Sequence, residues 1–300
     1  MCSMHCGMLG RGSRADVTVS FHTALGTDPL SDQMLEFARS AGIECTDIPR
    51  LPDRRPGLYS IHLQGAERSF TYWRDTSAAR LMMRYPEALW LKVAAADILY
   101  ISGITLAILP RRDCENLLNN LPRHKANSAA IAFDPNIRPH LWDDGDRMRS
   151  VINQAAALSD IILPSFDDER SAFGDPDPET TAKRYRALGA NHVVVKNGPD
   201  DTIHLHAGDM IRFPVARIDG VIDTTAAGDS FNGAYVAALV GGCRRATRLQ
   251  RLSSVPGRSF STRALWWPNQ NCLCEGPTMC HVPNLFEASK PPGIVDATDP

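Results

Sequence analysis

The sequence lacks a strong net charge and lacks the commonest nucleotide-binding signature. Its 32 Lys and Arg residues against 34 Asp and Glu residues give a formal net charge of -2 at pH 7, so there is no electrostatic argument for a nucleic-acid partner. The pattern Gly-x-x-x-x-Gly-Lys-Ser/Thr occurs nowhere in the chain. Because that pattern builds the P-loop, its absence excludes the P-loop nucleoside triphosphatases.

Long hydrophobic runs are missing as well. The most apolar stretch, residues 93–110, contains Asp97, Ser102 and Gly103, so we expect it to break into a helix end, a strand and a loop rather than to cross a bilayer. Residues 1–10 carry neither a basic segment nor a long apolar core, so no secretory signal is predicted. We therefore expect a cytoplasmic chain with reduced thiols and no membrane partner.

Cysteine is scarce in the middle of the chain. Of 8 cysteines, only Cys45 and Cys114 lie between residues 14 and 242. The others lie toward the two ends, and one group of them has the residue types of a zinc site: Cys272, Cys274, Cys280 and His281. That group lacks a Cys-x-x-Cys pair and flanking hairpin signals, so we interpret it as chance clustering.

Between the two ends, apolar runs alternate with amphipathic runs. Strands are predicted at residues 17–22, 98–102, 129–133, 161–163 and 193–196, with short strands near Ile203 and Ile211. Helices are predicted at residues 30–41, 112–121, 147–158, 169–173 and 179–188. This alternation is typical of a mainly parallel sheet flanked by helices, and 300 residues are enough for one large α/β domain. Residues 58–63 and 69–73 depart from it, because they flank a short polar segment and predict an antiparallel hairpin.

The run at residues 223–231, DTTAAGDSF, carries the clearest chemical signal. Small residues at 226–228 let a ligand approach the backbone, and the helix predicted at 231–240 would begin with free N–H groups that favour phosphate oxygens. Asp229 would then lie beside the phosphate as a general base for a hydroxyl group. Taken as a pattern alone, the run is also an ordinary helix cap, with Thr225 or Asp229 satisfying backbone donors.

A second motif, FDPNIRPHLW at residues 133–142, follows the buried strand predicted at 129–133. Open α/β sheets bind ligands at the carboxyl ends of their strands, so Asn136 and Arg138 are expected to face a site. The alternative for Arg138 is a surface ion pair after a proline-defined turn.

These two motifs resemble the signatures of the ribokinase-type (PfkB) carbohydrate kinases, and the second is similar to the branch of 2-keto-3-deoxygluconate kinases. Three further stretches resemble the same branch: residues 23–28, residues 57–59 with 70–74, and residues 100–109. The resemblance implies a ribokinase-like three-layer α/β fold at residues 14–242, with a small β lid at about residues 44–75. Residues 1–13 and 243–300 do not match, so we expect the first strand and C-terminal helices to be missing or altered and the tail to be poorly ordered.

The implied activity is ATP-dependent phosphorylation of 2-keto-3-deoxygluconate at its 6-hydroxyl group, with Mg²⁺. Asp229 is the implied base, and the backbone of Ala226, Ala227 and Gly228 is implied to stabilise the transferring phosphoryl group. The implied ligands of the sugar acid are Tyr59, Tyr72, Arg74, Arg138 and Asp229. The residues expected to bind ATP are Asn136, Arg138, Lys196, Gly198, Ala226, Ala227 and Gly228.

For magnesium, the expected residues are Asp168 and Glu169. They lie where the wider family carries Asn-x-x-Glu, although Ser165 stands in place of the asparagine. Acidic residues in a first helical turn are equally expected as partners of the helix dipole.

Two alternatives to this activity remain open at this point. Another sugar kinase, of the fructokinase or ribokinase type, would fit residues 223–231 but not the pair Arg74 and Arg138. A kinase-derived chain disabled at its ends would bind weakly or not at all, and a shifted reading frame before about residue 14 and after about residue 242 would explain such ends. The resemblance also implies that the lid pairs with a second subunit in a homo-oligomer.

Overall fold

The computed structural model describes residues 17–64, 67–126, 129–215 and 226–243, and the side chains of these ranges except 61–70 and 241–243. Among the described residues, the central sheet has six strands in the order β12-β11-β10-β9-β8-β7. They are β7 (Ile98–Ser102), β8 (Ala130–Asp134), β9 (Ile161–Ile162), β10 (His192–Val195), β11 (Thr202–His206) and β12 (Asp209–Phe213). Neighbours from β7 to β10 are parallel, whereas β11 and β12 form an antiparallel edge, so the mainly parallel α/β sheet is confirmed.

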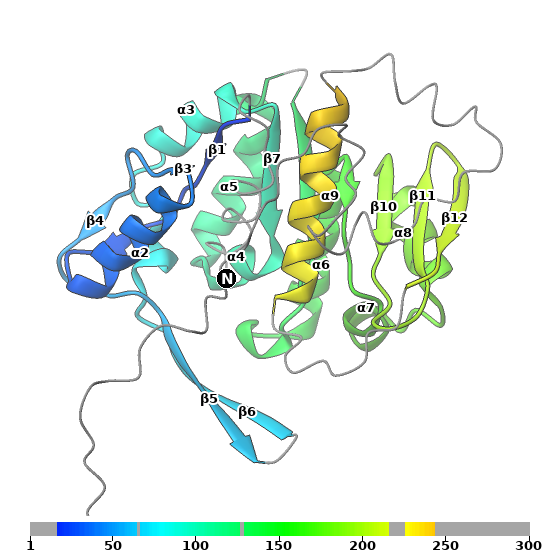
Figure 1. The fold of residues 1–300 in the computed structure, drawn as a ribbon, viewed down its shortest axis with the longest axis horizontal. Coiled ribbons are helices and arrows are strands. Elements are labelled where there is room, and N and C mark those ends of the chain that lie inside the picture. Colours follow the sequence, from blue (N-terminus) through cyan, green and yellow to red (C-terminus); the bar gives the residue numbers. More distant parts are fainter. Residues whose placement is uncertain (1–16, 65–66, 127–128, 216–225, 244–300) are drawn as a thin grey trace, which may run out of the picture.

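Helices cover both faces of this sheet (Figure 1). Ile131 and Phe133 of β8 share one core with helices on one face, whereas Ala132 packs with Phe231 and Tyr235 on the other face. Because both faces of β8 are covered, the strand has apolar residues at successive positions instead of alternating apolar and polar ones. The helices are α4 (Gly103–Ile108), α5 (Arg111–His124), α6 (Gly145–Ala157), α7 (Phe166–Phe173), α8 (Pro178–Ala187) and α9 (Ala227–Cys243).

The N-terminal part forms a smaller core of its own. The strand predicted at 17–22 is found only as β1 (Val19–Ser20), and it pairs with β3 (Ile43–Glu44) instead of joining the central sheet. Helix α2 (Pro29–Ser40) begins after Asp28, whose carboxylate accepts hydrogen bonds from two backbone N–H groups. The remaining elements of this part are β2 (Leu25–Gly26), β4 (Arg50–Leu51), η1 (Ala78–Leu81) and α3 (Glu87–Ala95).

The predicted hairpin is confirmed as β5 (Leu58–Gln64) and β6 (Glu67–Trp73). It projects from the body of the molecule in Figure 1. Tyr59 lies directly opposite Tyr72 in the register. The segments predicted not to match were 1–13 and 243–300; all of them except Cys243, the last residue of α9, lie outside the described residues, and so does the group of cysteines with zinc-site residue types.

One prediction was wrong, because the stretch after β7 is the helix α4 and not a loop. The Ser102 hydroxyl accepts a hydrogen bond from the backbone N–H of Ile104 and caps this helix. Its first residue packs against the segment after β8, since a Cβ built on Gly103 would lie 1.8 Å from the Pro135 carbonyl oxygen. Within the described ranges, no helix has both the length and the apolar character that crossing a membrane requires.

Candidate active site

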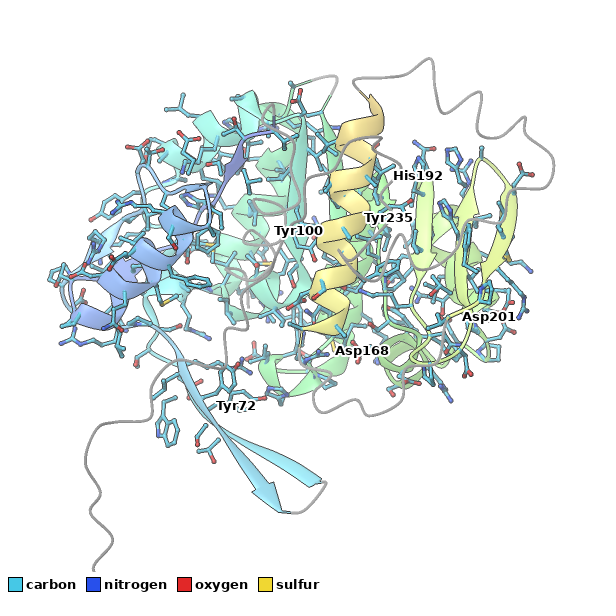
Figure 2. The ribbon with its side chains drawn as sticks, in the orientation of Figure 1. Tyr72, Tyr100, Asp168, His192, Asp201 and Tyr235 are labelled. Carbon is cyan, nitrogen blue, oxygen red and sulfur yellow. The ribbon has the colours of Figure 1, made fainter. Side chains whose placement is uncertain are left out.

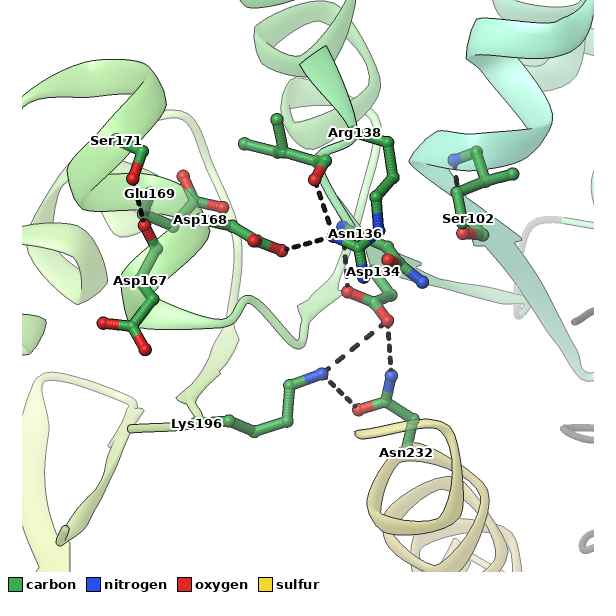
Figure 3. Close-up of polar contacts among 12 residues, drawn as sticks. Ser102, Asp134, Asn136, Arg138, Asp167, Asp168, Glu169, Ser171, Lys196 and Asn232 are labelled. Carbon is green, nitrogen blue, oxygen red and sulfur yellow. Dashed lines mark hydrogen bonds and ion pairs between the residues drawn. The ribbon is translucent and has the colours of Figure 1, made fainter. Parts of the chain in front are cut away.

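The carboxyl ends of the parallel strands bring the predicted motifs to one edge of the sheet. Asp134 is the last residue of β8, and Lys196 directly follows β10. The first turn of α9 lies at the same edge, where the helix meets both residues (Figure 3). Figure 2 shows Asp168 at this edge and His192, the first residue of β10, at the opposite edge of the sheet.

Asp134 is the centre of a buried polar network. Its side chain is 2% exposed, and one carboxylate oxygen accepts hydrogen bonds from the Asn232 amide at 2.7 Å and from the Tyr100 hydroxyl at 3.5 Å. The other oxygen accepts from the backbone N–H of Asn136 at 3.1 Å, which holds Asn136 in a left-handed turn with φ of 37°. The Lys196 ammonium lies 3.6 Å from the same carboxylate. Four segments of the chain are therefore fixed to one another at this edge.

The first turn of α9 lies beside a lysine side chain. Ala226 has a φ of 64°, and its carbonyl accepts hydrogen bonds from both the backbone N–H and the hydroxyl of Ser230. A Cβ built on Gly228 would lie 3.7 Å from the Lys196 ammonium, so a positive charge stands beside the helix N-terminus. Asp229, which is 6% exposed, lies in the same turn.

Arg138 faces this edge from the segment after β8. Its guanidinium donates to the Asp168 carboxylate at 3.1 Å and to the carbonyl of Ile137 at 2.6 Å (Figure 3). Burial raises the pKa of Asp168, and the charge of Arg138 opposes that rise. Both side chains keep part of their surface exposed, at 36% for Arg138 and 27% for Asp168. The pair is thus accessible to a ligand.

The structure separates the two residues predicted for magnesium. Glu169 is fully buried, where it accepts hydrogen bonds from the Tyr185 hydroxyl and from Arg184, and burial raises its pKa to about 7. Neighbouring residues on a helix point about 100° apart, so only Asp168 faces the site. In the described part of the chain, no group of three or more His, Cys, Asp or Glu residues fits a metal ion. Asp168 by itself fits Mg²⁺ that keeps its waters and is held mainly by phosphate oxygens.

The base of the hairpin approaches the same region. The Arg74 guanidinium lies 2.8 Å from the ring nitrogen of His140, in η2 (Pro139–Leu141), and stacks over the Tyr72 ring at 4.0 Å. Tyr72 also stacks with His140 at 5.4 Å, and Tyr59 lies 6.2 Å from Tyr72. Because a guanidinium only donates, the ring nitrogen of His140 accepts the hydrogen bond from Arg74. Burial and the charges of Arg74 and Arg138 lower the pKa of His140.

The structure therefore brings together most of the predicted residues. Gly198 occupies the turn after Lys196, with a φ of 56° that favours glycine. The sequence reasoning missed Asp134, Asn232, Tyr100 and His140 as members of the site. Asn232 carried a usable signal, because it lies three residues after Asp229 and hence on nearly the same face of a helix. The contacts of Tyr100 and His140 depend on tertiary packing.

The chain is similar to known carbohydrate kinases. The model for the pfkB family of carbohydrate kinases matches residues 9–250. The chain is 38% identical over 235 residues to the 2-dehydro-3-deoxygluconokinase of Escherichia coli, covering 76% of each protein. It is 37% identical over 234 residues to the enzyme of the same name from Haemophilus influenzae, covering 75% of this chain and 73% of that one.

Solved structures show the same fold. A PfkB protein from Polaromonas sp. JS666 has a TM-score of 0.67 and 26% sequence identity, over 80% of this chain and 78% of that one. A fructokinase from Xylella fastidiosa with bound ATP has a TM-score of 0.67 and 22% identity, over 81% of this chain and 76% of that one. The ribokinase-like α/β fold predicted from the sequence is confirmed, and the chain belongs to the pfkB family of carbohydrate kinases.

Proposed function

We propose that the protein phosphorylates 2-keto-3-deoxygluconate at its 6-hydroxyl group, with ATP as the phosphoryl donor. The observation that carries this proposal is the meeting of two kinds of group at one sheet edge. Asp229 is in the first turn of α9, the Lys196 ammonium lies beside that turn, and Arg138 lies across the same edge (Figure 3). A kinase of an acidic sugar needs a base and a phosphate site at one end and a cationic carboxylate site at the other. The names of the relatives from Escherichia coli and Haemophilus influenzae support the same substrate.

At the phosphoryl end, Asp229 takes the proton of the 6-hydroxyl group as its oxygen attacks the γ-phosphorus. The new O–P bond forms while the bond between the γ-phosphorus and the bridging oxygen breaks, and ADP leaves. The backbone N–H groups of residues 226–228 stabilise charge on the transferring group, each well-placed donor contributing on the order of 10²- to 10³-fold in rate. Lys196 adds a positive charge beside them, with Gly198 and Asn136 shaping the adjoining turns.

At the sugar end, Arg138 and Arg74 bind the carboxylate of the substrate. A guanidinium presents two parallel N–H groups that match a carboxylate, which a neutral sugar does not offer. Tyr59 and Tyr72 line the hairpin side of this region, where Tyr72 stacks with Arg74. This end gives the specificity for an acid over fructose or ribose.

Magnesium, when bound with ATP, neutralises phosphate charge. Asp168 is the residue that would orient its water shell, since the carboxylate is partly exposed and faces the site. The present contact with Arg138 would then be shared or exchanged. Glu169 has no part in this proposal, because its carboxylate is committed to Tyr185 and Arg184.

The experiment that tests the proposal measures ATP consumption by the purified chain with Mg²⁺ and 2-keto-3-deoxygluconate, beside an Asp229→Asn variant. Turnover by the natural chain, abolished in the variant while sugar binding persists, is the expected result. A panel with fructose and ribose tests the substrate. Faster turnover of either neutral sugar would overturn the assignment of the acid. Folded chain that turns over none of the three would indicate a disabled kinase.

A further inference from the structure

Lys196 is held by side chains that have no direct role in the proposed chemistry. Its ammonium lies 3.0 Å from the amide oxygen of Asn232 and 3.6 Å from the Asp134 carboxylate (Figure 3). The side chain of Lys196 is 12% exposed, and Asn232 is fully buried. A lysine side chain has four rotatable carbon bonds, so a fixed ammonium in such a place needs partners that select one conformation.

The orientation of the Asn232 amide follows from its partners. Its NH₂ group donates to Asp134 at 2.7 Å and to the Tyr100 hydroxyl at 3.1 Å, and both acceptors lie on neighbouring strands. The amide oxygen is therefore turned toward Lys196, where it accepts the hydrogen bond. Reversal of the amide would place NH₂ against an ammonium and oxygen against a carboxylate, so only one orientation is compatible with these neighbours.

We propose that Asn232 is a positioning residue that, together with Asp134, holds the Lys196 ammonium at the phosphate site on the first turn of α9. The inference rests on the proposed kinase function and deepens it. Asn232 and Asp229 are three residues apart on the same helix, so the base and the cation are placed by one rigid element. A shift of α9 would move both groups together.

The charge distribution agrees with this role. Among the described residues, Asn232 and Asp134 contact the ammonium, which has three N–H donors in all. One donor is thus left to point along the helix end toward the position of Gly228, where a phosphate oxygen would lie. Asp134 shares its negative charge with hydrogen bonds from Asn136, Asn232 and Tyr100, so it steadies the ammonium without forming a short ion pair.

The competing explanation is that the network only stabilises the fold. A double-mutant cycle separates the two, because residues that act through one another give non-additive effects. The variants are Asn232→Leu, Lys196→Met and the double variant. The measurements are ATP dissociation constants without sugar, steady-state kcat and KM with sugar, and the thermal midpoint of unfolding.

Under the proposal, Lys196→Met weakens ATP binding about tenfold or more, the loss expected for a charge-assisted hydrogen bond. Asn232→Leu produces a loss of the same order, and the double variant binds ATP no worse than Lys196→Met alone. Multiplied losses in the double variant would overturn the inference, as would an Asn232→Leu variant that melts earlier but binds ATP normally.

Two further variants keep the test decisive. Tyr235→Phe removes a hydrogen bond from the same helix at a distance from Lys196, so it should lower the thermal midpoint and leave ATP affinity within about twofold. If Asn232→Leu does not fold, Asn232→Ala removes the amide group without adding a charge or a larger apolar side chain. The Lys196 ammonium then loses its contact with residue 232, so weaker ATP binding is again expected, and unchanged binding would contradict the proposal.

The outcomes also distinguish this inference from the proposed function. Coupling between Asn232 and Lys196 in ATP binding, without turnover of the sugar acid, supports the inference and refutes the substrate. Turnover of the sugar acid with additive variants supports the function and refutes the inference. A folded natural chain that does not bind ATP refutes both.

Discussion

At the scale of single residues, Arg138 gives the sharpest test of the sugar end. We expect Arg138→Met to raise the KM for 2-keto-3-deoxygluconate about 10- to 100-fold, since a hydrogen bond to a charged group contributes about 1.5 to 3 kcal/mol. The KM for ATP should change much less. Steady-state kinetics with each substrate varied in turn provide the measurement.

The exposed residue Arg112 provides the matched control for this prediction. Arg112→Met removes the same charge and side chain from α5 and should leave both KM values unchanged. If Arg138→Met weakened turnover of fructose or ribose as strongly as that of the acid, Arg138 would have no special role toward a carboxylate.

The role of a residue can be predicted from the sequence when the residues that it acts with lie close to it in the sequence. Asp229 and Arg138 belong to contiguous motifs, so residue order alone indicated them. Asn232 gains its role from Asp134, 98 positions away, and from Lys196. Glu169 shows the reverse case, because an acidic residue near a predicted metal site turned inward to Arg184 and Tyr185. Local sequence does not specify which side of a short helix will be covered.

At the scale of elements, histidines link α9 to the sheet. His192 of β10 lies opposite His206 of β11, and their rings stack at 3.9 Å. The Tyr235 hydroxyl of α9 lies 3.2 Å from a ring nitrogen of His204. Burial, together with the charges of the other histidines, lowers the pKa values of His192 and His204 to about 4. Acidification therefore acts on the contact between the helix and the sheet.

The sign of this effect follows from linkage. Histidines with an ordinary pKa of 6.5 bind protons in the unfolded chain before they do so in the folded one, so the free energy of unfolding falls as the pH drops from about 6.5 to about 4. Each pKa unit corresponds to about 1.4 kcal/mol, which sets an upper limit of about 3 kcal/mol for the more deeply buried His204. Urea titrations at several pH values should show a smaller fall for His204→Gln than for the natural chain.

The natural chain is compared with the His204→Gln variant because the titration of Glu169 changes the free energy of unfolding in the opposite direction. Its pKa of about 7 in the folded protein lies above the ordinary 4.5, so its protonation stabilises the fold as the pH falls. This contribution is common to both chains and cancels in their difference. Equal slopes in the two chains would show that His204 is not held neutral by its surroundings.

Element prediction worked where burial is regular. Strands such as β8 and β10 are covered on both faces and are continuously apolar, and the hairpin was marked by two short runs around a polar turn. Helix α4 was missed because the apolar run at 104–108 has no polar face to show a helical period. The start of this helix is marked by the Ser102 cap and by the close contact of Gly103 with Pro135. Neither feature is visible in the pattern of apolar residues.

At the scale of the whole molecule, we propose self-association through the hairpin. A two-stranded hairpin by itself is marginally stable in water, and Leu58 and Trp73 at its base are 57% and 58% exposed. Leu58→Asp should shift sedimentation toward a smaller species and raise the KM for the sugar acid. Leu91→Asp is the control, since Leu91 on α3 is 74% exposed and should tolerate the change. A natural chain that sediments as a monomer would contradict this proposal.

The arrangement of the whole chain was only partly predictable. The family model matches residues 9–250, whereas the residue motifs indicated residues 14–242. The order of strands in the sheet and the pairing of β1 with β3 depend on contacts between distant segments, which no local period encodes. The charge balance and the absence of a P-loop excluded some classes of protein, but they did not predict the position of any strand in the sheet.

The turn between β11 and β12 has a consequence for engineering the protein. Ala207 and Gly208 form it with φ values of 52° and 96°, and His206 beside it pairs with the first residue of β10. Lys196 follows the last residue of β10, so the turn and the proposed active site lie at opposite ends of that strand. The turn is thus a natural insertion point, where a reporter domain or new chain termini could be joined without entering the chemistry.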